Sequence, residues 1–372
     1  MRDAMDRAAA GAAVLLVTAG LAAGAAASPA LAAPGGASHA APAWKVVKKV
    51  SGEDFTAVVA TGGNGGWAFG SGTASPNPKP TAWRRRGSSW TRVPFPGQSN
   101  EVVVTAAATS ASDVWAFTTG GSRSRVLRWN GRAWSVQRTF RQPIGGAAVI
   151  SPGDVWVFGQ PSFPAVASGT WHYNGRTWTE VARGHGLEGG SALSAHDVWA
   201  FDGTDVAHWN GSAWSRTSVA RLLPAAQQTH LNDPAVTGIF AVSKHSVYAT
   251  GNGNTEDDGG PMVLLHWNGQ RWSKVAGGLY GFDVQPVQPI ASDGHGGLWI
   301  PMAGPEGGTD GRLLHYSGGH LTAAVLPGGP GRSSLDTVAR IPGTTKVLAG
   351  GFAHAADNAG LDAAGVLLEY EA

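Results

Sequence analysis

The stretch Asp113-Val114-Trp115-Ala116-Phe117 decides the fold of this chain, because altered copies of it return along most of the sequence. It is followed by Arg128-Trp129-Asn130-Gly131 and then by Trp134, and clear copies of all three parts recur twice downstream. The central residue of each copy stands at seven positions, which are Trp67, Trp115, Trp156, Trp199, Tyr248, Trp299 and Leu348. A repeat of this length indicates an array of one supersecondary unit.

Successive copies are 41 to 51 residues apart, the range for a β-propeller blade of four short strands. In the fifth repeat, segments rich in Val, Trp, Phe and Thr predict strands over 238–242, 247–250, 262–267 and 271–275. Asn-Gly joins the third strand to the fourth in four repeats, and both positions of this pair tolerate the positive φ of a tight hairpin. No sustained helical period follows the N-terminus. We therefore expect an all-β, seven-bladed β-propeller of four-stranded antiparallel blades without substantial helix.

The two ends of the repeat array predict how the ring closes. The seventh repeat has a third strand ending at 368–372 and no fourth. Trp44-Lys45-Val46-Val47 matches the fourth-strand pattern Trp272-Ser273-Lys274-Val275. We expect the N-terminal strand to complete the last blade, which protects the sheet edges that an open array exposes. The propeller then spans residues 43–372.

The first 32 residues read as a signal peptide. A polar start over 1–7 is followed by a small, apolar run over 8–27, and Ala30-Leu31-Ala32 fits a cleavage site. We expect a mature chain from Ala33, a flexible leader over 33–42, and a secreted, extracellular monomer without a membrane span. The rival interpretation is a retained anchor, although a segment this rich in Ala and Gly makes a poor permanent span.

Composition excludes several kinds of chemistry. The chain has no cysteine, which rules out disulfides, a lipid-anchored cysteine and a cysteine nucleophile. Its net charge is +2, and the single short run Arg84-Arg85-Arg86 does not indicate a nucleic-acid partner.

The tryptophans and histidines follow the repeats. All sixteen tryptophans occupy recurring blade positions, which predicts packing within and between blades rather than stacking on sugars. Four histidines precede the third-strand aromatic residue in separate blades, so a shared exposed face explains them better than a metal site does. These four are His172, His208, His266 and His315.

Function should lie where the repeats differ. Connections between strands 1 and 2 and between strands 3 and 4 are short, whereas those between strands 2 and 3 and from strand 4 to the next blade are long and open on the opposite face. Variable loops on a rigid scaffold are the usual place for binding. The long segments are Gly70 to Pro80, Gly159 to Ser168, Arg216 to Val236, Gly251 to Pro261, Ala276 to Pro286, Met302 to Gly311 and Phe352 to Ala364.

Loop aromatic residues and carboxylates are the candidate ligand contacts on that face. Phe95 and Phe140 are further aromatic residues that we place outside the repeat framework. No catalytic residue, metal ligand or cofactor is expected, although the acidity of 253–260 leaves calcium open without the spacing of a known loop. The candidate contacts are Tyr280, Phe282, Phe163, Glu256, Asp257, Asp258, Glu306 and Asp310.

The motif Asp-Val-Trp-Ala followed by His-Trp-Asn-Gly and Trp-Ser resembles the secreted propellers common in actinobacteria, which are loosely kelch-like and galactose-oxidase-like. The resemblance covers residues 43–372 and implies a fold rather than an activity. The copper chemistry of galactose oxidase needs a cysteine-linked tyrosine, and this chain has no cysteine. Ser292-Asp293-Gly294-His295-Gly296-Gly297-Leu298-Trp299 resembles a sialidase Asp-box, with its Asp one position early.

Three functions stay open. A non-catalytic module that binds a cell-surface or environmental glycan, or an extracellular protein, fits the single repetitive domain best. An extracellular glycoside hydrolase or polysaccharide lyase would place paired carboxylates at the channel mouth. A structural role in the envelope or spore surface is the third, and the fold alone does not choose among them.

Overall fold

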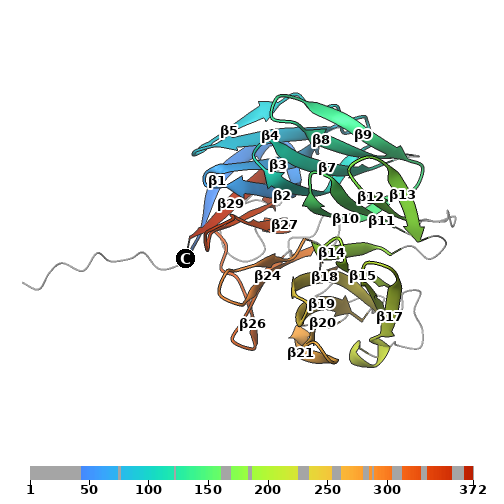
Figure 1. Cartoon of the computed structure of the whole chain (residues 1–372). Helices are drawn as coiled ribbons and strands as arrows, with labels where there is room; N and C mark the ends of the chain where they lie inside the picture. The colour runs from blue at the N-terminus through green and yellow to red at the C-terminus, as the bar shows by residue number, and fades with distance from the viewer. Residues whose placement is uncertain are drawn as a thin grey trace, which may run out of the picture. The chain divides into compact units, whose positions relative to one another are not determined.

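The computed structural model contains seven four-stranded antiparallel blades arranged in a ring, as the repeats predict (Figure 1). One compact unit spans Ala41–Ala372, and Met1–Ala40 form a separate unit. The structure describes residues 43–73, 77–120, 123–160, 169–182, 187–224, 234–253, 261–279, 285–286, 289–303, 312–327, 333–353 and 364–371.

The first strands of neighbouring blades contact one another around the ring and form its inner wall. In blade 6 this strand consists of two short pieces that both pair with β24. The first strands are β2 (Glu53–Gly62), β6 (Val102–Ser110), β10 (Ile144–Ser151), β14 (Gly189–Ser194), β18 (Ala235–Ser243), β22 (Gln285–Pro286) with β23 (Ala291–Ser292), and β27 (Ser333–Arg340).

The second and third strands of each blade carry the signature residues. The second strands are β3 (Gly65–Gly72), β7 (Asp113–Thr119), β11 (Asp154–Gly159), β15 (Asp197–Asp202), β19 (Ser246–Asn252), β24 (Leu298–Ala303) and β28 (Val347–Ala353). The third strands are β4 (Pro80–Arg86), β8 (Ser124–Trp129), β12 (Thr170–Tyr173), β16 (Asp205–Trp209), β20 (Met262–Trp267), β25 (Arg312–Ser317) and β29 (Ala364–Glu371).

The fourth strands form the outer edges of the blades, and the fourth strand of blade 7 is the N-terminal strand β1. β1 pairs antiparallel with β29, and Trp44 lies opposite Tyr370, so the predicted ring closure is confirmed (Figure 1). The only helical segment within the described ranges is the 3-10 turn Ala220–Leu222. The outer strands are β1 (Ala43–Ser51), β5 (Ser89–Val93), β9 (Trp134–Phe140), β13 (Trp178–Ala182), β17 (Trp214–Ser218), β21 (Trp272–Leu279) and β26 (His320–Ala323).

Aromatic side chains hold neighbouring blades together. The ring centre of Trp67 in blade 1 lies 4.9 Å from that of Trp129 and 5.1 Å from that of Trp134, both in blade 2. Such pairs stabilise a fold beyond the apolar area that they bury. The same contact recurs from Trp156 to Trp209 and Trp214, from Trp199 to Trp267 and Trp272, and from Trp299 to Trp44 and Tyr370.

All sixteen tryptophans are buried or half-buried, in agreement with the prediction that they pack within or between blades. The placement of Phe95 and Phe140 outside the framework is wrong. The ring centre of Phe95 lies 5.2 Å from that of Trp134, and that of Phe140 lies 5.3 Å from that of Trp171. Phe95 lies just after β5, and Phe140 ends β9. Each ring packs against a tryptophan of the next blade, in the same kind of seam.

The turn between strands 3 and 4 differs in detail from the expected two-residue hairpin. The Asn130 side-chain oxygen accepts hydrogen bonds from the N–H groups of Arg132 and Ala133, each at 3.0 Å. Only the glycine of each Asn-Gly pair has positive φ, as at Gly131 (93°). The asparagine therefore caps a wider turn through its side chain. Asn174, Asn210 and Asn268 make the same pair of bonds.

Candidate functional site

All eight sequence-predicted contact residues lie outside the described residues. Their connections are nevertheless fixed by the strands on either side of them. Phe163 belongs to the connection from β11 to β12, the acidic group 256–258 to that from β19 to β20, and Tyr280 and Phe282 to that from β21 to β22. Glu306 and Asp310 belong to the connection from β24 to β25. These are connections between strands 2 and 3 or between blades, so they belong to one face of the ring, which we call the variable face.

Two carboxylates lie on the inner wall toward the variable face. Asp54 is near the start of β2, and Asp336 is on the neighbouring first strand β27. Burial raises the pKa of Asp54 to about 6, with a further contribution from Glu53. Burial also raises the pKa of Asp336 to about 7, and the nearby charge of Asp54 adds to this effect.

The polar contacts of this pair are incomplete. The Ser334 hydroxyl donates to Asp336 at 3.3 Å, whereas the buried Oδ1 of Asp54 has no hydrogen-bond partner among the described residues. Burial and the charge of Asp54 favour a state in which Asp336 keeps its proton near neutral pH. The arrangement can hold or release a proton at the entrance to the ring.

This pair is absent from the sequence-predicted contacts because those contacts were expected in the loops. The available signal was an aspartate within each of two first strands that otherwise contain small and apolar residues. A third half-buried acid on the same face is Glu188, just before β14, whose pKa is raised by burial and by the charge of Asp202.

A shallow pocket of about 380 Å³ lies beside the outer half of blade 1, also toward the variable face. It offers one cationic side chain, Arg92, next to an apolar wall. Its lining residues are Pro80, Thr81, Arg92, Val93, Pro94 and Phe95.

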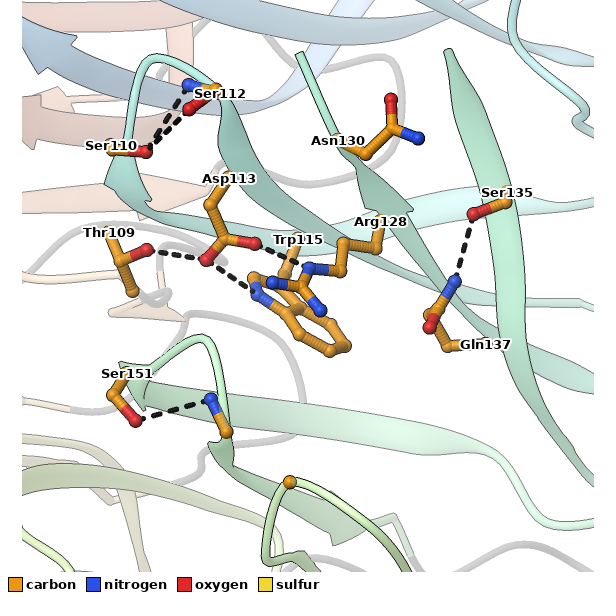
Figure 2. A network of polar contacts seen from close by, with 12 residues as sticks. Thr109, Ser110, Ser112, Asp113, Trp115, Arg128, Asn130, Ser135, Gln137 and Ser151 are labelled. Atoms are coloured by element: carbon orange, nitrogen blue, oxygen red, sulfur yellow. Dashed lines mark hydrogen bonds and ion pairs between the residues drawn. The ribbon is translucent and has the colours of Figure 1, made fainter. Parts of the chain in front are cut away.

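The opposite face carries a polar cluster in most blades, and Figure 2 shows the one in blade 2. Asp113 at the start of β7 accepts hydrogen bonds from Trp115 Nε1 at 3.2 Å, from Arg128 Nε and from the Thr109 hydroxyl. The Arg128 guanidinium lies 4.8 Å from the centre of the Trp115 ring. The cluster joins three strands of one blade, so its first role is to fix the blade.

The four histidines occupy the position of Arg128 in their own blades. His208 Nε2 lies 2.9 Å from Asp197 Oδ1, and its ring stacks on Trp199 with centres 4.1 Å apart. His172 and His315 make equivalent contacts with Asp154 and Asp293. The interpretation of these histidines as a shared exposed face is therefore wrong, because they are half-buried and bonded within their blades.

The chemistry of the clusters differs between blades. His266 faces Ser246 instead of an acid, at 3.0 Å, and burial lowers its pKa, which favours the neutral ring. Burial raises the pKa of Asp293, but the N–H groups of His295 and Gly297 and the ring of His315 hold it below its usual value. Within the described ranges, no three His, Cys, Asp or Glu side chains come together in a metal-binding group.

Comparison with known proteins identifies the fold. No protein-family model matches the chain, and no curated protein sequence matches it. Among solved structures, YCF48 bound to a D1 peptide is 11% identical with a TM-score of 0.57, and the match covers 88% of this chain and 97% of that one.

Two further matches are longer proteins. The GH74 xyloglucanase from Xanthomonas campestris is 13% identical with a TM-score of 0.53, over 85% of this chain and 54% of that one. The extracellular domain of the two-component system BT4673 from B. thetaiotaomicron is 10% identical with a TM-score of 0.56, over 88% and 39%. Identities this low show a shared propeller fold alone. The part of the chain that the structure describes holds no helix long and apolar enough to cross a membrane.

Proposed function

We propose that this chain is an exported, non-catalytic binding propeller that takes a glycan or an extracellular protein on its variable face. One observation carries the proposal, namely the contrast between the two faces. On the opposite face, the Asn-capped turn recurs in four blades, and Ser110, Ser151, Ser194, Ser243 and Ser292 each accept a backbone N–H in the turn between strands 1 and 2.

Connections on the variable face differ in length from blade to blade. The connection between strands 2 and 3 is only 203–204 in blade 4, whereas it is 253–261 in blade 5. The scaffold thus tolerates a short connection at this position, and the longer ones are not required for closing a blade. Loops of this kind on a rigid frame usually bind ligands. That YCF48 has been solved with a D1 peptide supports the idea that a ring of this type can hold a ligand.

The test uses the short connection of blade 4 as a replacement. Connections 160–169 and 253–261 are each exchanged for Gly-Thr, the sequence of 203–204, and the variants are screened against a glycan array and the proteins of the culture medium. We expect ligand capture to be lost while the melting temperature changes by a few degrees at most. The matched control exchanges the turn 130–133 for the sequence of 174–177 and keeps capture. Capture that survives both loop exchanges contradicts the proposal.

The carboxylate pair favours a glycoside hydrolase as a second candidate, because a proton-holding carboxyl beside an ionised one is the arrangement of acid-catalysed glycoside cleavage. Release of reducing sugar from polysaccharides on the same array, and its loss in Asp336→Asn, would replace the binding proposal with this one. The proposed export depends on residues 1–32 acting as a signal peptide. If mass spectrometry shows that the secreted chain does not begin at Ala33, the proposed cleavage is contradicted.

A further inference from the structure

Blade 1 lacks the acid that the polar clusters of blades 2, 3, 4 and 6 possess. The strand register places Arg84 opposite Trp67, as it places Arg128 opposite Trp115. Two residues before Trp115 stands Asp113, which neutralises Arg128, whereas two residues before Trp67 stands Gly65. Arg84 forms no ion pair within the described part of the chain, so its charge is uncompensated.

The surroundings of Arg84 hold the cation in place without neutralising it. Its guanidinium lies 5.1 Å from the ring centre of Trp129 and 5.5 Å from that of Trp67, so it sits at the seam of blades 1 and 2. Indole faces attract a cation but carry no net charge. Burial lowers the pKa of Arg84, and the charge of Arg86 lowers it further. An anion beside both guanidinium groups would relieve this repulsion.

The same two blades and strand β1 have a strong excess of positive charge. Residues 43–141 contain fourteen Lys and Arg and four Asp and Glu, although the whole chain has a net charge of +2. All four acids, Glu53, Asp54, Glu101 and Asp113, are buried or half-buried. The exposed charges of this region are all cations, of which Lys45 is paired with Glu371 of β29. They are Lys45, Lys49, Lys79, Arg86, Arg92, Arg123, Arg132, Arg138 and Arg141.

Two of the four acids are also neutralised by ion pairs inside the blades. Arg125 Nε donates to Glu101 Oε1 at 2.6 Å, and Asp113 is bound by Arg128. The surface of this region therefore presents positive charge with no exposed carboxylate among its described residues. Its field attracts polyanions over a Debye length of about 10 Å at 0.1 M salt.

We propose that blades 1 and 2 bind a linear anionic polysaccharide, with Arg84 and Arg86 holding one of its acidic groups. A guanidinium fork matches carboxylate and sulfate groups. The spread of cations over two blades suits repeated charges along a polymer rather than a single small anion. Single-stranded nucleic acid fits less well because its binding uses exposed aromatic side chains for base stacking, and the tryptophans of these blades pack in the seams. Arg86 ends β4 at the turn between strands 3 and 4, on the opposite face from the loops proposed above, whereas Lys79, Arg92, Arg123 and Arg141 lie toward the variable face. The variant of Arg84 and Arg86 therefore tests this proposal separately from the loop exchanges.

The test measures fluorescence anisotropy of labelled alginate and heparin fragments at 50 mM salt, with neutral dextran of equal length as a reference. We expect binding of at least one anionic polymer, none of dextran, and a loss of at least tenfold in affinity between 50 and 200 mM salt, as for about two released counterions. Arg84→Gln with Arg86→Gln should weaken binding at least tenfold.

Two further variants keep the test decisive if the seam tolerates no change at Arg84. Arg86→Gln with Arg132→Gln removes only exposed cations and should weaken binding several-fold. Lys244→Gln with Lys274→Gln, two exposed cations of blade 5, should leave affinity within twofold. Failure to bind either polymer, equal losses in the blade 1 and blade 5 variants, or tighter binding of duplex DNA of equal charge would each overturn the proposal.

Discussion

At the scale of single residues, the seam between blades 7 and 1 differs from the aromatic seams. Leu348 replaces the second-strand tryptophan, and Arg85 stands where blade 2 has Trp129. Arg85 Nη1 lies 2.5 Å from Glu369 Oε2, and each side chain is less than a tenth exposed. The position that is His or Arg in the other blades is thus an acid in blade 7, and the next blade supplies its cation.

We expect Glu369→Gln to lower the free energy of unfolding by about 3–5 kcal/mol, because it leaves the Arg85 charge buried without its partner. Urea denaturation measures this change. The matched control is Lys45→Ala, which breaks the exposed pair between Lys45 and Glu371, and should cost less than about 1 kcal/mol. Similar losses in the two variants would show that the buried pair is not what holds this seam.

At the scale of strands, Asp54 and Asp336 make the contact between β2 and β27 sensitive to pH. Their folded pKa values, about 6 and about 7, lie above the value of 3.8 for an exposed aspartate. The folded state therefore keeps protons that the unfolded state releases, and stability is lost as pH rises from about 4 through 7. Acids whose pKa is lowered on folding, such as Glu371 with a pKa of about 2, change the folding stability only at lower pH.

We expect the free energy of unfolding to fall by up to a few kcal/mol between pH 5 and 8, at about 1.4 kcal/mol per pKa unit. Asp336→Asn should flatten this decline by at least half, because it removes the higher pKa and lifts the repulsion on Asp54. Asp205→Asn, on the third strand of blade 4, should leave the slope unchanged. Melting temperatures across this pH range decide the matter, and parallel curves for wild type and Asp336→Asn would contradict it.

Strand order and register followed from the sequence because they are local, whereas contacts between distant strands did not. The pairing of Trp129 with Trp134 depends on one hairpin whose signature repeats. The Asp54–Asp336 pair depends on two strands from opposite ends of the chain, joined where the Val58 N–H donates to Thr337 Oγ1. The acid partners of His172 and His208 could have been predicted, since Asp154 and Asp197 each stand two residues before the second-strand tryptophan, whereas Asp293, the partner of His315, stands six residues before Trp299. The unpaired Arg84 could have been found in the same way, by aligning Gly65 with Asp113.

At the scale of the whole molecule, one strand converts a row of blades into a closed ring. β1 covers the edge of β29 over the register Ala43–Glu371 to Ser51–Ala364. Its Trp44 contributes to the seam with blade 6, where its ring centre lies 5.2 Å from that of Trp299. Closure therefore joins the two ends of the chain through backbone pairing and through one aromatic cluster. Loss of this strand should affect blades 6 and 7 together.

We expect deletion of residues 43–51 to lower the melting temperature by about 10 °C or more, because the loss of a buried tryptophan alone costs about 3–5 kcal/mol. Lys45→Ser with Lys49→Ser changes only exposed side chains of the same strand and should shift the melt by about 2 °C or less. A peptide of residues 41–52 added in excess should restore part of the loss, since it binds only the folded ring. An unchanged melt after the deletion would mean that the other six seams hold the ring by themselves, and that β1 is an edge cover rather than its closure.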